Sequence, residues 1–350
     1  MQRLRRGTMM LVLSGSTILA IAPQARAQAT PGSGYHVTRH IDVGGEGGWD
    51  YLTYDAPHHH LFLSHGTQVD VVDPDAGAVV GHIPDTPGVH GIALAPELGR
   101  GFISNGRDTS VTVFDLKTLA TITKIRVTGR NPDAIMYEPI TKRVFTFNGG
   151  GQNTTAIDAV ADTVIGTMDL GGKPEFAVPD GEGGAFVNIE DKGEIVSFDA
   201  RQLTIRGRWP MEGCEEPSAL AIDRAHHRLF SGCSNQRMMV LDDASGRVVT
   251  SAPIGDGVDA GAFDPGTGLA FASTGDGNLT VIHEETPDSV RVVASVATQR
   301  GARTMALDST THRVYVVTAS FGPPPAPTPD RPRPRPSIVP GTFTVLVIEP

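Results

Sequence analysis

The sequence predicts an all-β protein, a seven-bladed β-propeller of four-stranded antiparallel blades that is closed by the N-terminal strand joining the last blade. Three observations lead to this prediction: a repeat of about 42 residues, β-branched apolar runs without helical periodicity, and a turn-rich composition with 41 glycines and 26 prolines in 350 residues. One small sheet cannot bury both of its faces, so such repeats must stack on their neighbours to form a core.

Seven units align on their first residues, which lie 40, 43, 42, 43, 41 and 44 positions apart. The units begin at Trp49, Val89, Pro132, Pro174, Pro217, Val258 and Ala302. In six units an aromatic residue lies 13 positions after the start, and in the fourth unit Phe186 comes one position early. The first six units each read as four short strands, and in the first five the third strand ends in an Asp that suits an Asx turn, as at Asp73.

The two ends of the chain are expected to share one blade. The seventh unit ends at "TFTVLVIEP" without a fourth strand, whereas "YHVTRHIDVGG", residues 35–45, resembles a fourth strand and precedes the first unit. We therefore expect this strand to complete the last blade, so that residues 35–350 form one domain.

Residues 1–27 are interpreted as a cleaved export signal. Three arginines precede an apolar run from Met9 to Ala22, and an Ala-Arg-Ala motif at 25–27 has the spacing that signal peptidase recognises. A membrane anchor is the alternative, but the run is shorter than the roughly 20 residues that a spanning helix needs. We expect residues 28–34 to form a linker and the mature protein to be periplasmic or secreted, with no membrane span.

The mature chain is expected to be strongly acidic. Loss of residues 1–27 removes four arginines and no acid, which leaves 25 basic residues against 39 acidic ones and a net charge of −14. This charge argues against nucleic acid and anionic lipid as partners, because both are bound chiefly through Lys and Arg. One basic cluster, Arg331, Arg333 and Arg335, alternates with prolines, and we expect a solvated extended segment there.

These repeats resemble those of the YncE-like, YVTN-type seven-bladed propellers that bacteria export. The resemblance covers residues 35–350 and rests on the Asp/Pro turn, the "SNG" end of the second strand and the "VDVVD" type of third strand. It implies the propeller fold, whereas the activity it implies is broad, because such propellers include binding proteins, subunits of redox systems and some hydrolases or lyases.

The two cysteines, Cys214 and Cys233, bracket the first two strands of the fifth unit. One lies just before the first strand and the other in the turn after the second strand, so both fall on the same rim of one blade. In an exported protein such a pair persists as a disulfide, which we expect here. Free buried thiols and soft-metal ligands are the alternatives.

The second residue of each unit forms the candidate site, because the first strands of a propeller line its central channel. These residues are Asp50, His90, Asp133, Glu175, Ser218, Asp259 and Arg303. Carboxylates crowded at a low-dielectric mouth repel one another, so at least one pKa should be raised unless a cation neutralises the set. We expect all of them except Ser218 to contact a ligand.

The first four units supply Asp50, His90, Asp133 and Glu175 on adjacent blades. Carboxylate oxygens with an imidazole suit a divalent ion such as Ca²⁺, Mg²⁺ or Zn²⁺, or an amine, and this half-ring is the candidate metal site. In the alternative interpretation, Arg303 pairs with Asp50 across the ring closure and the remaining acids are simply hydrated.

Other polar segments are assigned to turns. The histidine-rich turns between first and second strands, on the rim opposite the acids, are expected to be solvated and contain His58, His59, His60, His226, His227 and His312. The turns between second and third strands are expected to hold His65, Asn105, Asn148 and Asn188. In blade seven this turn is a Pro-rich loop, 320–341, which is either a functional lid or handle or disordered.

The sequence leaves the function open among three classes, and catalysis is undecided. It contains no Gly-x-Ser-x-Gly, His-Glu-x-x-His or Cys-x-x-Cys-His motif and no phosphate-cradling loop. We expect first a monomeric scaffold that binds a small molecule or a periplasmic protein on the acidic rim. The alternatives are a metal-dependent hydrolase or lyase, similar to lactonases, at the same rim, and an accessory subunit of a periplasmic redox system, which rests on the resemblance alone.

Overall fold

The structure is a computed structural model that describes residues 34–326 and 336–350. The expected signal peptide at 1–27 and the expected linker, apart from Gly34, lie outside the described residues. So do Arg331, Arg333 and Arg335 of the Pro-rich loop. The expectations for these segments therefore stay predictions.

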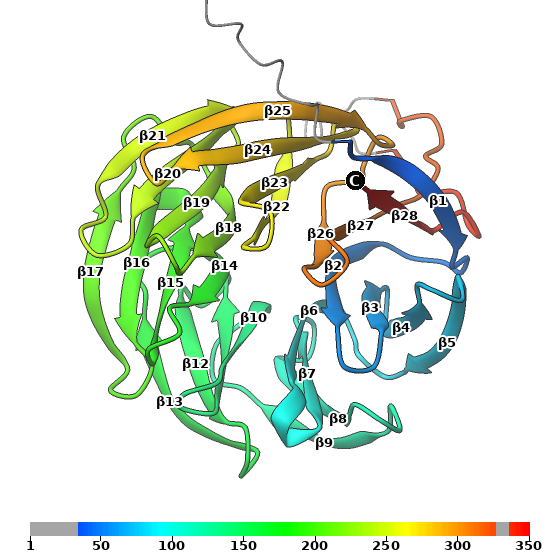
Figure 1. Cartoon of the computed structure of the whole chain (residues 1–350). Coiled ribbons are helices and arrows are strands. Elements are labelled where there is room, and N and C mark those ends of the chain that lie inside the picture. Colours follow the sequence, from blue (N-terminus) through cyan, green and yellow to red (C-terminus); the bar gives the residue numbers. More distant parts are fainter. Residues whose placement is uncertain (1–33, 327–335) are drawn as a thin grey trace, which may run out of the picture. The chain divides into compact units, whose positions relative to one another are not determined.

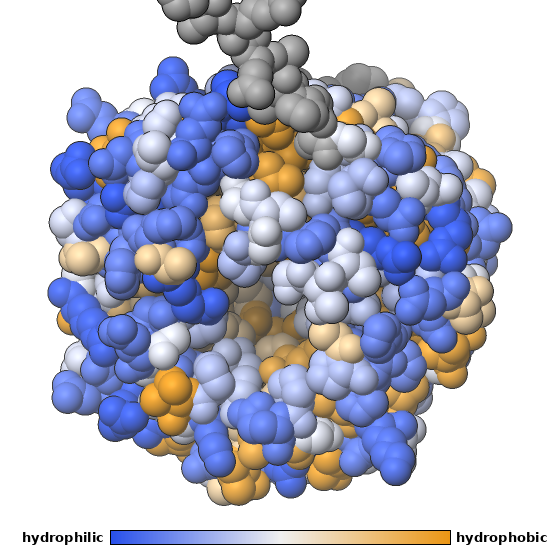
Figure 2. All heavy atoms as spheres, in the orientation of Figure 1, coloured by the Kyte–Doolittle hydropathy of each residue, from blue (hydrophilic) through white to orange (hydrophobic). Residues whose placement is uncertain are grey.

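The described chain folds into seven four-stranded antiparallel sheets arranged as blades around a central axis, which confirms the predicted fold class (Figure 1). The ring is hollowed at its centre (Figure 2). The helical elements of residues 34–326 and 336–350 are two 3-10 turns, η1 (Pro96–Leu98) and η2 (Glu190–Lys192). No helix in this part of the chain is long and apolar enough to cross a membrane.

The first three blades follow one another along the chain, each with its first strand innermost (Figure 1). Blade one consists of β2 (Trp49–Asp55), β3 (His60–His65), β4 (Gln68–Asp73) and β5 (Ala78–Ile83). Blade two consists of β6 (Val89–Ala95), β7 (Arg100–Asn105), β8 (Ser110–Asp115) and β9 (Thr121–Arg126). Blade three consists of β10 (Pro132–Glu138), β11 (Arg143–Asn148), β12 (Asn153–Asp158) and β13 (Thr163–Asp169).

The next three blades repeat this order. Blade four consists of β14 (Pro174–Pro179), β15 (Gly184–Ile189), β16 (Glu194–Asp199) and β17 (Thr204–Pro210). Blade five consists of β18 (Pro217–Asp223), β19 (Arg228–Cys233), β20 (Arg237–Asp242) and β21 (Val248–Pro253). Blade six consists of β22 (Val258–Asp264), β23 (Leu269–Thr274), β24 (Asn278–Thr286) and β25 (Ser289–Ala297).

Blade seven joins the two ends of the described chain. It consists of β26 (Met305–Asp308), β27 (Arg313–Thr318), β28 (Thr344–Glu349) and β1 (His36–Asp42). Strand β1 pairs antiparallel with β28, from His36 opposite Glu349 to Asp42 opposite Thr344, and it is the outermost strand of the sheet. The predicted closure of the ring by the N-terminal strand is thereby confirmed.

The core lies between neighbouring blades, where both faces of the second and third strands are buried. The aromatic residue 13 positions after the start of a unit is at most 1 % exposed in all six units, at Phe62, Phe102, Phe145, Phe230, Phe271 and Tyr315. Full burial of one such side chain stabilises the fold by about 2 to 3 kcal/mol. The Asp that ends a third strand makes the expected Asx turn, since Asp73 Oδ1 accepts hydrogen bonds from the backbone N–H groups of Asp75 and Ala76, at 2.9 and 2.8 Å.

The expected disulfide is present. Cys214 and Cys233 are bonded, with Cα atoms 5.4 Å apart, and the bond ties the segment before β18 to the end of β19. Cys233 is the last residue of β19, so it belongs to the strand and not to the turn that follows.

Candidate functional site

The candidate residues lie where the inner strands leave the regular ladder. In β2, Trp49 pairs with His65 and Leu52 pairs with Leu63, so the strand shifts register at the position of Asp50. The other complete inner strands, β6, β10, β14, β18 and β22, shift at the same position. Such a bulge redirects side chains away from the alternation of a flat strand, here toward the mouth of the channel.

Buried side chains of the second strands hold these irregular segments in place. Ser64 Oγ accepts hydrogen bonds from the backbone N–H groups of Asp50 and the next residue, at 2.9 and 2.8 Å. Ser104, Asn188 and Ser273 donate to backbone carbonyls in the corresponding segment of the next blade. All four side chains are buried. The backbone that carries the site is therefore fixed from behind by hydrogen bonds that bulk water does not reach.

The candidate residues surround one cavity of about 410 Å³, which we call the acidic pocket. Six of the seven residues at the second position of the units line it: Asp50, Asp133, Glu175, Ser218, Asp259 and Arg303. Six residues that the sequence analysis did not assign to the site also line it: Tyr51, Lys173, Glu190, Glu216, Ser234 and Val258. The topology thus brings side chains from six different blades to one opening.

His90 connects two of the acids at the edge of this pocket. Its Nδ1 lies 2.7 Å from Oδ2 of Asp50 and 3.4 Å from Oδ1 of Asp133. Burial acts to lower the pKa of His90, but the hydrogen bond to Asp50 and the charge of Asp133 raise it above its ordinary value. Burial raises the pKa of Asp133 to about 6; His90 opposes this rise and Asp50 adds to it. These three residues offer ligand atoms within 4.8 Å of one another.

Glu175 belongs to a different cluster. Lys173 Nζ lies 2.8 Å from Oε1 of Glu175 and also forms an ion pair with Glu190. Burial raises the pKa of Glu175, Lys173 opposes the rise, and Asp133 adds to it. The structure therefore divides the expected half-ring: three of its members lie together, and the fourth is held by a lysine that the metal hypothesis did not include.

The pairing of Arg303 with Asp50, which the alternative interpretation of the site required, is wrong. Arg303 precedes β26, and its Nε lies 3.1 Å from Oδ2 of Asp259 in blade six, while Asp50 is bonded to His90. The side chain of Arg303 thus turns to the acid on the preceding blade. The physical reason is that Asp50 already has an imidazole donor at 2.7 Å.

Two aromatic rings meet in the channel. Tyr51 of blade one stacks on Phe176 of blade four, with ring centroids 4.7 Å apart and an interplanar angle of 27°. The corresponding residues of four other blades are small: Gly91, Ala134, Ala219 and Ala260. Burial raises the pKa of Tyr51 well above its ordinary value, and Asp133 and Glu175 add to this, so the phenol stays protonated. A neutral aromatic stack therefore lies among the acids.

Negative charge is in excess in the acidic pocket. Six carboxylates line it, those of Asp50, Asp133, Glu175, Glu190, Glu216 and Asp259, against the two cations Lys173 and Arg303. Among the described residues the charge is at most −4, reached when all six acids are ionised, or −3 when the neighbouring His90 is protonated; the raised pKa values of Asp133 and Glu175 reduce this negative charge further. A bound cation would reduce the repulsion between these carboxylates.

Two of the missed residues could have been found from the repeat. Lys173 and Glu216 directly precede the fourth and fifth units, at the position that holds Gly48, Gly88 and Gly257 in other units. The residue just before a unit lies two positions from the candidate site residue and reaches the same channel mouth. The two charged residues at this position, Lys173 and Glu216, are the ones that line the pocket. Tyr51 could have been found in a similar way, because it is a large residue at the third position of its unit, where four other units have Gly or Ala.

The histidine turns lie on the opposite rim, away from the acidic pocket. His58 Nδ1 is 2.7 Å from Oδ2 of Asp55, and His312 Nδ1 is 2.7 Å from Oδ2 of Asp264. These histidines therefore pair with acids that end first strands. One grouping was not expected: His226 lies with Asp223 and Glu284, whose ligand atoms are within 4.8 Å of one another.

Four residues assigned to turns are in fact buried at strand ends. They are His65, Asn105, Asn148 and Asn188, each at most 3 % exposed. His65 Nδ1 bonds to Asp70 Oδ2 at 2.7 Å, and Asn148 Nδ2 donates to Thr155 at 3.0 Å. These hydrogen bonds hold the rim of the blade together, although His65 Nε2 and Asn105 Oδ1 have no partner among the described residues.

Comparison with known proteins supports the fold. No family model matches the chain, and no curated protein matches it. A chain of the mitotic checkpoint complex matches with a TM-score of 0.73 at 13 % identity, over 98 % of this chain and 99 % of that chain. The WD40 repeats of RRP9 match with 0.74 at 8 % identity, over 90 % and 97 % of the two chains.

A chain of hydrazine synthase from Kuenenia stuttgartiensis matches with a TM-score of 0.67 at 17 % identity, over 77 % of this chain and 92 % of that chain. Identities this low show a shared propeller fold and nothing about activity. The fold implied by the resemblance to YncE-like propellers is therefore confirmed, and the resemblance itself stays a prediction.

Proposed function

We propose that the protein is a binding propeller whose acidic pocket takes a small organic cation, such as a primary amine. The observation that carries this proposal is the excess of carboxylates over cations in the pocket. An ammonium group would find acceptors on several blades at once, because the carboxylates of Asp50, Asp133 and Glu175 line the same cavity. The neutral aromatic ring of Tyr51 favours a cation that carries carbon over a strongly hydrated inorganic ion.

Calorimetric titration with methylamine, putrescine and phenethylamine tests this proposal. We expect Asp133→Asn and Glu175→Gln each to weaken binding by about tenfold to a hundredfold, since a hydrogen bond to a charged group contributes about 1.5 to 3 kcal/mol. Glu182→Gln is the matched control, because Glu182 is an exposed acid between β14 and β15 on the opposite rim. If no amine binds, or if all three variants bind alike, the proposal is wrong.

A metal-dependent hydrolase or lyase, similar to lactonases, is the second candidate. It is favoured by the grouping of Asp50, His90 and Asp133, whose ligand atoms lie within 4.8 Å of one another. Two carboxylates and an imidazole fit Zn²⁺, and Ca²⁺ or Mg²⁺ would need further oxygen ligands. An ion held there would polarise a carbonyl oxygen or acidify a bound water molecule.

Elemental analysis of protein purified without chelator separates the two candidates. The metal candidate requires a stoichiometric ion that His90→Gln removes, together with hydrolysis by wild type of at least one member of a panel of lactones. Absence of both the ion and the hydrolysis would reject it and leave the binding protein.

Location and partners belong to the same proposal. The disulfide between Cys214 and Cys233 supports a periplasmic or secreted protein, because such bonds persist in oxidising compartments. We propose a monomer with a small-molecule ligand, and a periplasmic protein is the alternative partner. A role as an accessory redox subunit rests on the resemblance alone, and co-purification from the native host would test it.

A further inference from the structure

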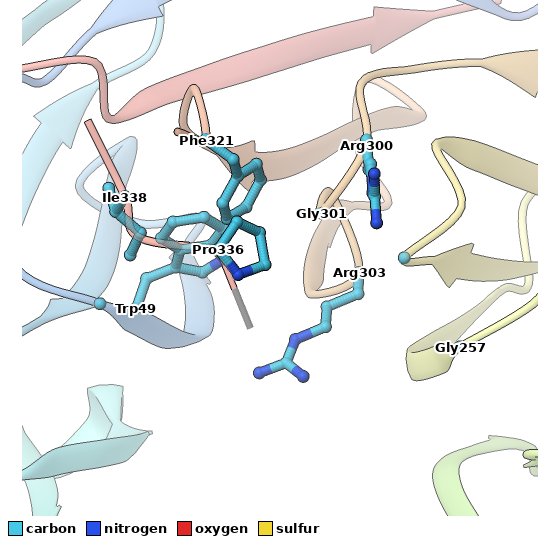
Figure 3. Close-up of a pocket in the computed structure, with 10 residues that line it drawn as sticks. Trp49, Gly257, Arg300, Gly301, Arg303, Phe321, Pro336 and Ile338 are labelled. Carbon is cyan, nitrogen blue, oxygen red and sulfur yellow. The ribbon is translucent and has the colours of Figure 1, made fainter. Parts of the chain in front are cut away.

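A second cavity of about 410 Å³ lies beside the acidic pocket, between blades one, six and seven, and shares Arg303 with it. Its wall is apolar on one side, where Trp49, Phe321, Pro336 and Ile338 gather (Figure 3). Arg300 and Arg303 face the cavity from the other side (Figure 3). We call this cavity the arginine pocket.

The apolar wall is held in place by backbone pairing and by contacts between aromatic rings. Phe321 and Ile338 form an antiparallel bridge, so the two described ends of the Pro-rich loop are paired at its base. The ring of Trp49 lies 5.4 Å from that of Phe343 and 6.0 Å from that of Phe321, measured between centroids. Trp49 also has a buried Nε1 without a hydrogen-bond partner in the described chain, although buried donors normally have one.

The two arginines are carried by a short segment that is tied down on both sides. The backbone N–H of Gly301 donates to the carbonyl of Gly275 at 2.9 Å, and the hydroxyl of Thr318 donates to the carbonyl of Arg300 at 2.8 Å. Arg303 is neutralised by Asp259. Arg300 has no acidic partner among residues 34–326 and 336–350, so it places positive charge in the pocket of an otherwise acidic protein.

We propose that the arginine pocket binds an organic anion, a carboxylate with an apolar body about the size of an aromatic ring. The guanidinium of Arg300 would take the carboxylate, because its planar donors match two carboxylate oxygens. Trp49 and Phe321 would bury the apolar body, as the walls of most small-ligand sites do, and the volume is in the range of such sites. Inorganic phosphate would leave this apolar wall in contact with water. The inference goes beyond the proposed amine site, because the groups that carry it are different.

Titration with phenylacetate, followed by calorimetry and by the tryptophan fluorescence of a Trp209→Phe variant that keeps Trp49, tests the inference. We expect phenylacetate to bind at least tenfold more tightly than the neutral phenylacetamide and than inorganic phosphate. Arg300→Gln should weaken phenylacetate binding at least tenfold, and Phe321→Ala should weaken it for phenylacetate and phenylacetamide alike. The matched control is Arg107→Gln, which removes the same charge from an exposed position in the turn between β7 and β8 and should leave binding unchanged.

The inference is overturned if phenylacetamide binds as tightly as phenylacetate, or if the Arg300 and Arg107 variants bind alike. Asp133→Asn separates this site from the proposed amine site. It should abolish or weaken amine binding and leave phenylacetate binding intact, so one proposal can fail while the other holds.

Discussion

Asp133 is partly buried among other acids, and its raised pKa makes ionisation less favourable in the folded chain than in the unfolded one. A carboxyl group of this kind binds its proton more tightly when folded. Its contribution to stability is therefore lost as the pH rises from 3.8, the ordinary Asp value, through about 6. Such a residue lowers stability at neutral pH, which is typical of side chains kept for binding.

We expect Asp133→Asn to stabilise the protein at pH 8 and to change little at pH 4. A rise of the pKa from 3.8 to about 6 already includes the attraction to His90, and it corresponds to a gain of at most about 3 kcal/mol. Urea unfolding of both proteins at the two pH values, in metal-free buffer, measures the difference. A variant less stable than wild type at pH 8 would contradict this account of the pocket.

Glu284 shows the same effect on the opposite rim. Burial and the neighbouring carboxylate of Asp223 raise its pKa to about 7, although His226 opposes the rise. The ordinary value is 4.5, so this residue destabilises the fold increasingly as the pH rises from 4.5 through about 7. The side chain of Glu284 is 3 % exposed, so solvent screens the effect weakly.

Glu284→Gln should therefore stabilise the protein at pH 8, by about 1 to 3 kcal/mol, and leave its stability at pH 4 unchanged. The amide can donate a hydrogen bond to Asp223 without requiring a proton from solvent. Glu285→Gln is the control, because Glu285 is exposed and pairs with Arg291 at the surface, where an ion pair contributes little. Equal effects of the two substitutions in unfolding experiments would show that burial of Glu284 is not the cause.

The inner strands are the elements that connect fold to site. Their bulges are stabilised from behind by buried second-strand side chains, and neighbouring bulges approach closely. A Cβ atom at Gly91 would lie 2.8 Å from Cγ2 of Ile135 and 3.2 Å from the carbonyl oxygen of Asp133. The glycine is therefore required for the close packing of β6 against the segment of β10 that carries an acid of the pocket.

Gly91→Ala should destabilise the protein by about 1 to 3 kcal/mol through this overpacking, and it should also weaken amine binding by displacing Asp133. The control is Gly48→Ala, whose Cβ would meet no atom closer than 3.9 Å. Thermal unfolding and amine titration of both variants check the prediction. If Gly91→Ala binds and unfolds like wild type, the bulge does not position the acid.

For the individual strands, the sequence predicted their positions along the chain but not the register shifts of the inner strands. The aromatic residues recur at a fixed position because the stacked blades bury them, so their period reveals the fold. The register shifts depend on hydrogen bonds from residues such as Ser64 and Asn188, which belong to other strands or other blades. For this reason His65 and Asn105 were expected in turns although they are buried at strand ends.

The arrangement of all seven blades determines which charged side chains lie close together. The repeat predicted that Asp50, Asp133 and Glu175 approach one axis, and they line one pocket. It could not predict that Lys173 forms an ion pair with Glu175 or that Arg303 pairs with Asp259. Equivalent positions in the repeat show which residues lie near the axis but not the direction of their side chains. The arginine pocket was missed for a related reason: it combines the start of one blade with the loop of another.

Closure of the ring depends on β1, the outermost strand of blade seven, which pairs with β28. Ile41 is 1 % exposed, faces Val345 across the pair and packs in a cluster with Tyr315 and Val347. Its neighbour His40 is exposed on the other face of the same strand. The two residues therefore allow one charge to be placed on the buried or on the solvent face of the closing strand.

Ile41→Asp should destabilise the protein by about 3 to 5 kcal/mol, because a charge cannot be buried there without a partner. It should also release β1, so that β28 becomes an open edge prone to association and trypsin cuts at Arg39. His40→Asp, with the same added charge, should change stability by less than about 0.5 kcal/mol and leave Arg39 protected. Urea unfolding, light scattering and limited proteolysis measure these effects. If both variants remain equally stable and protected, β1 is an addition to the blade and not the closure of the ring.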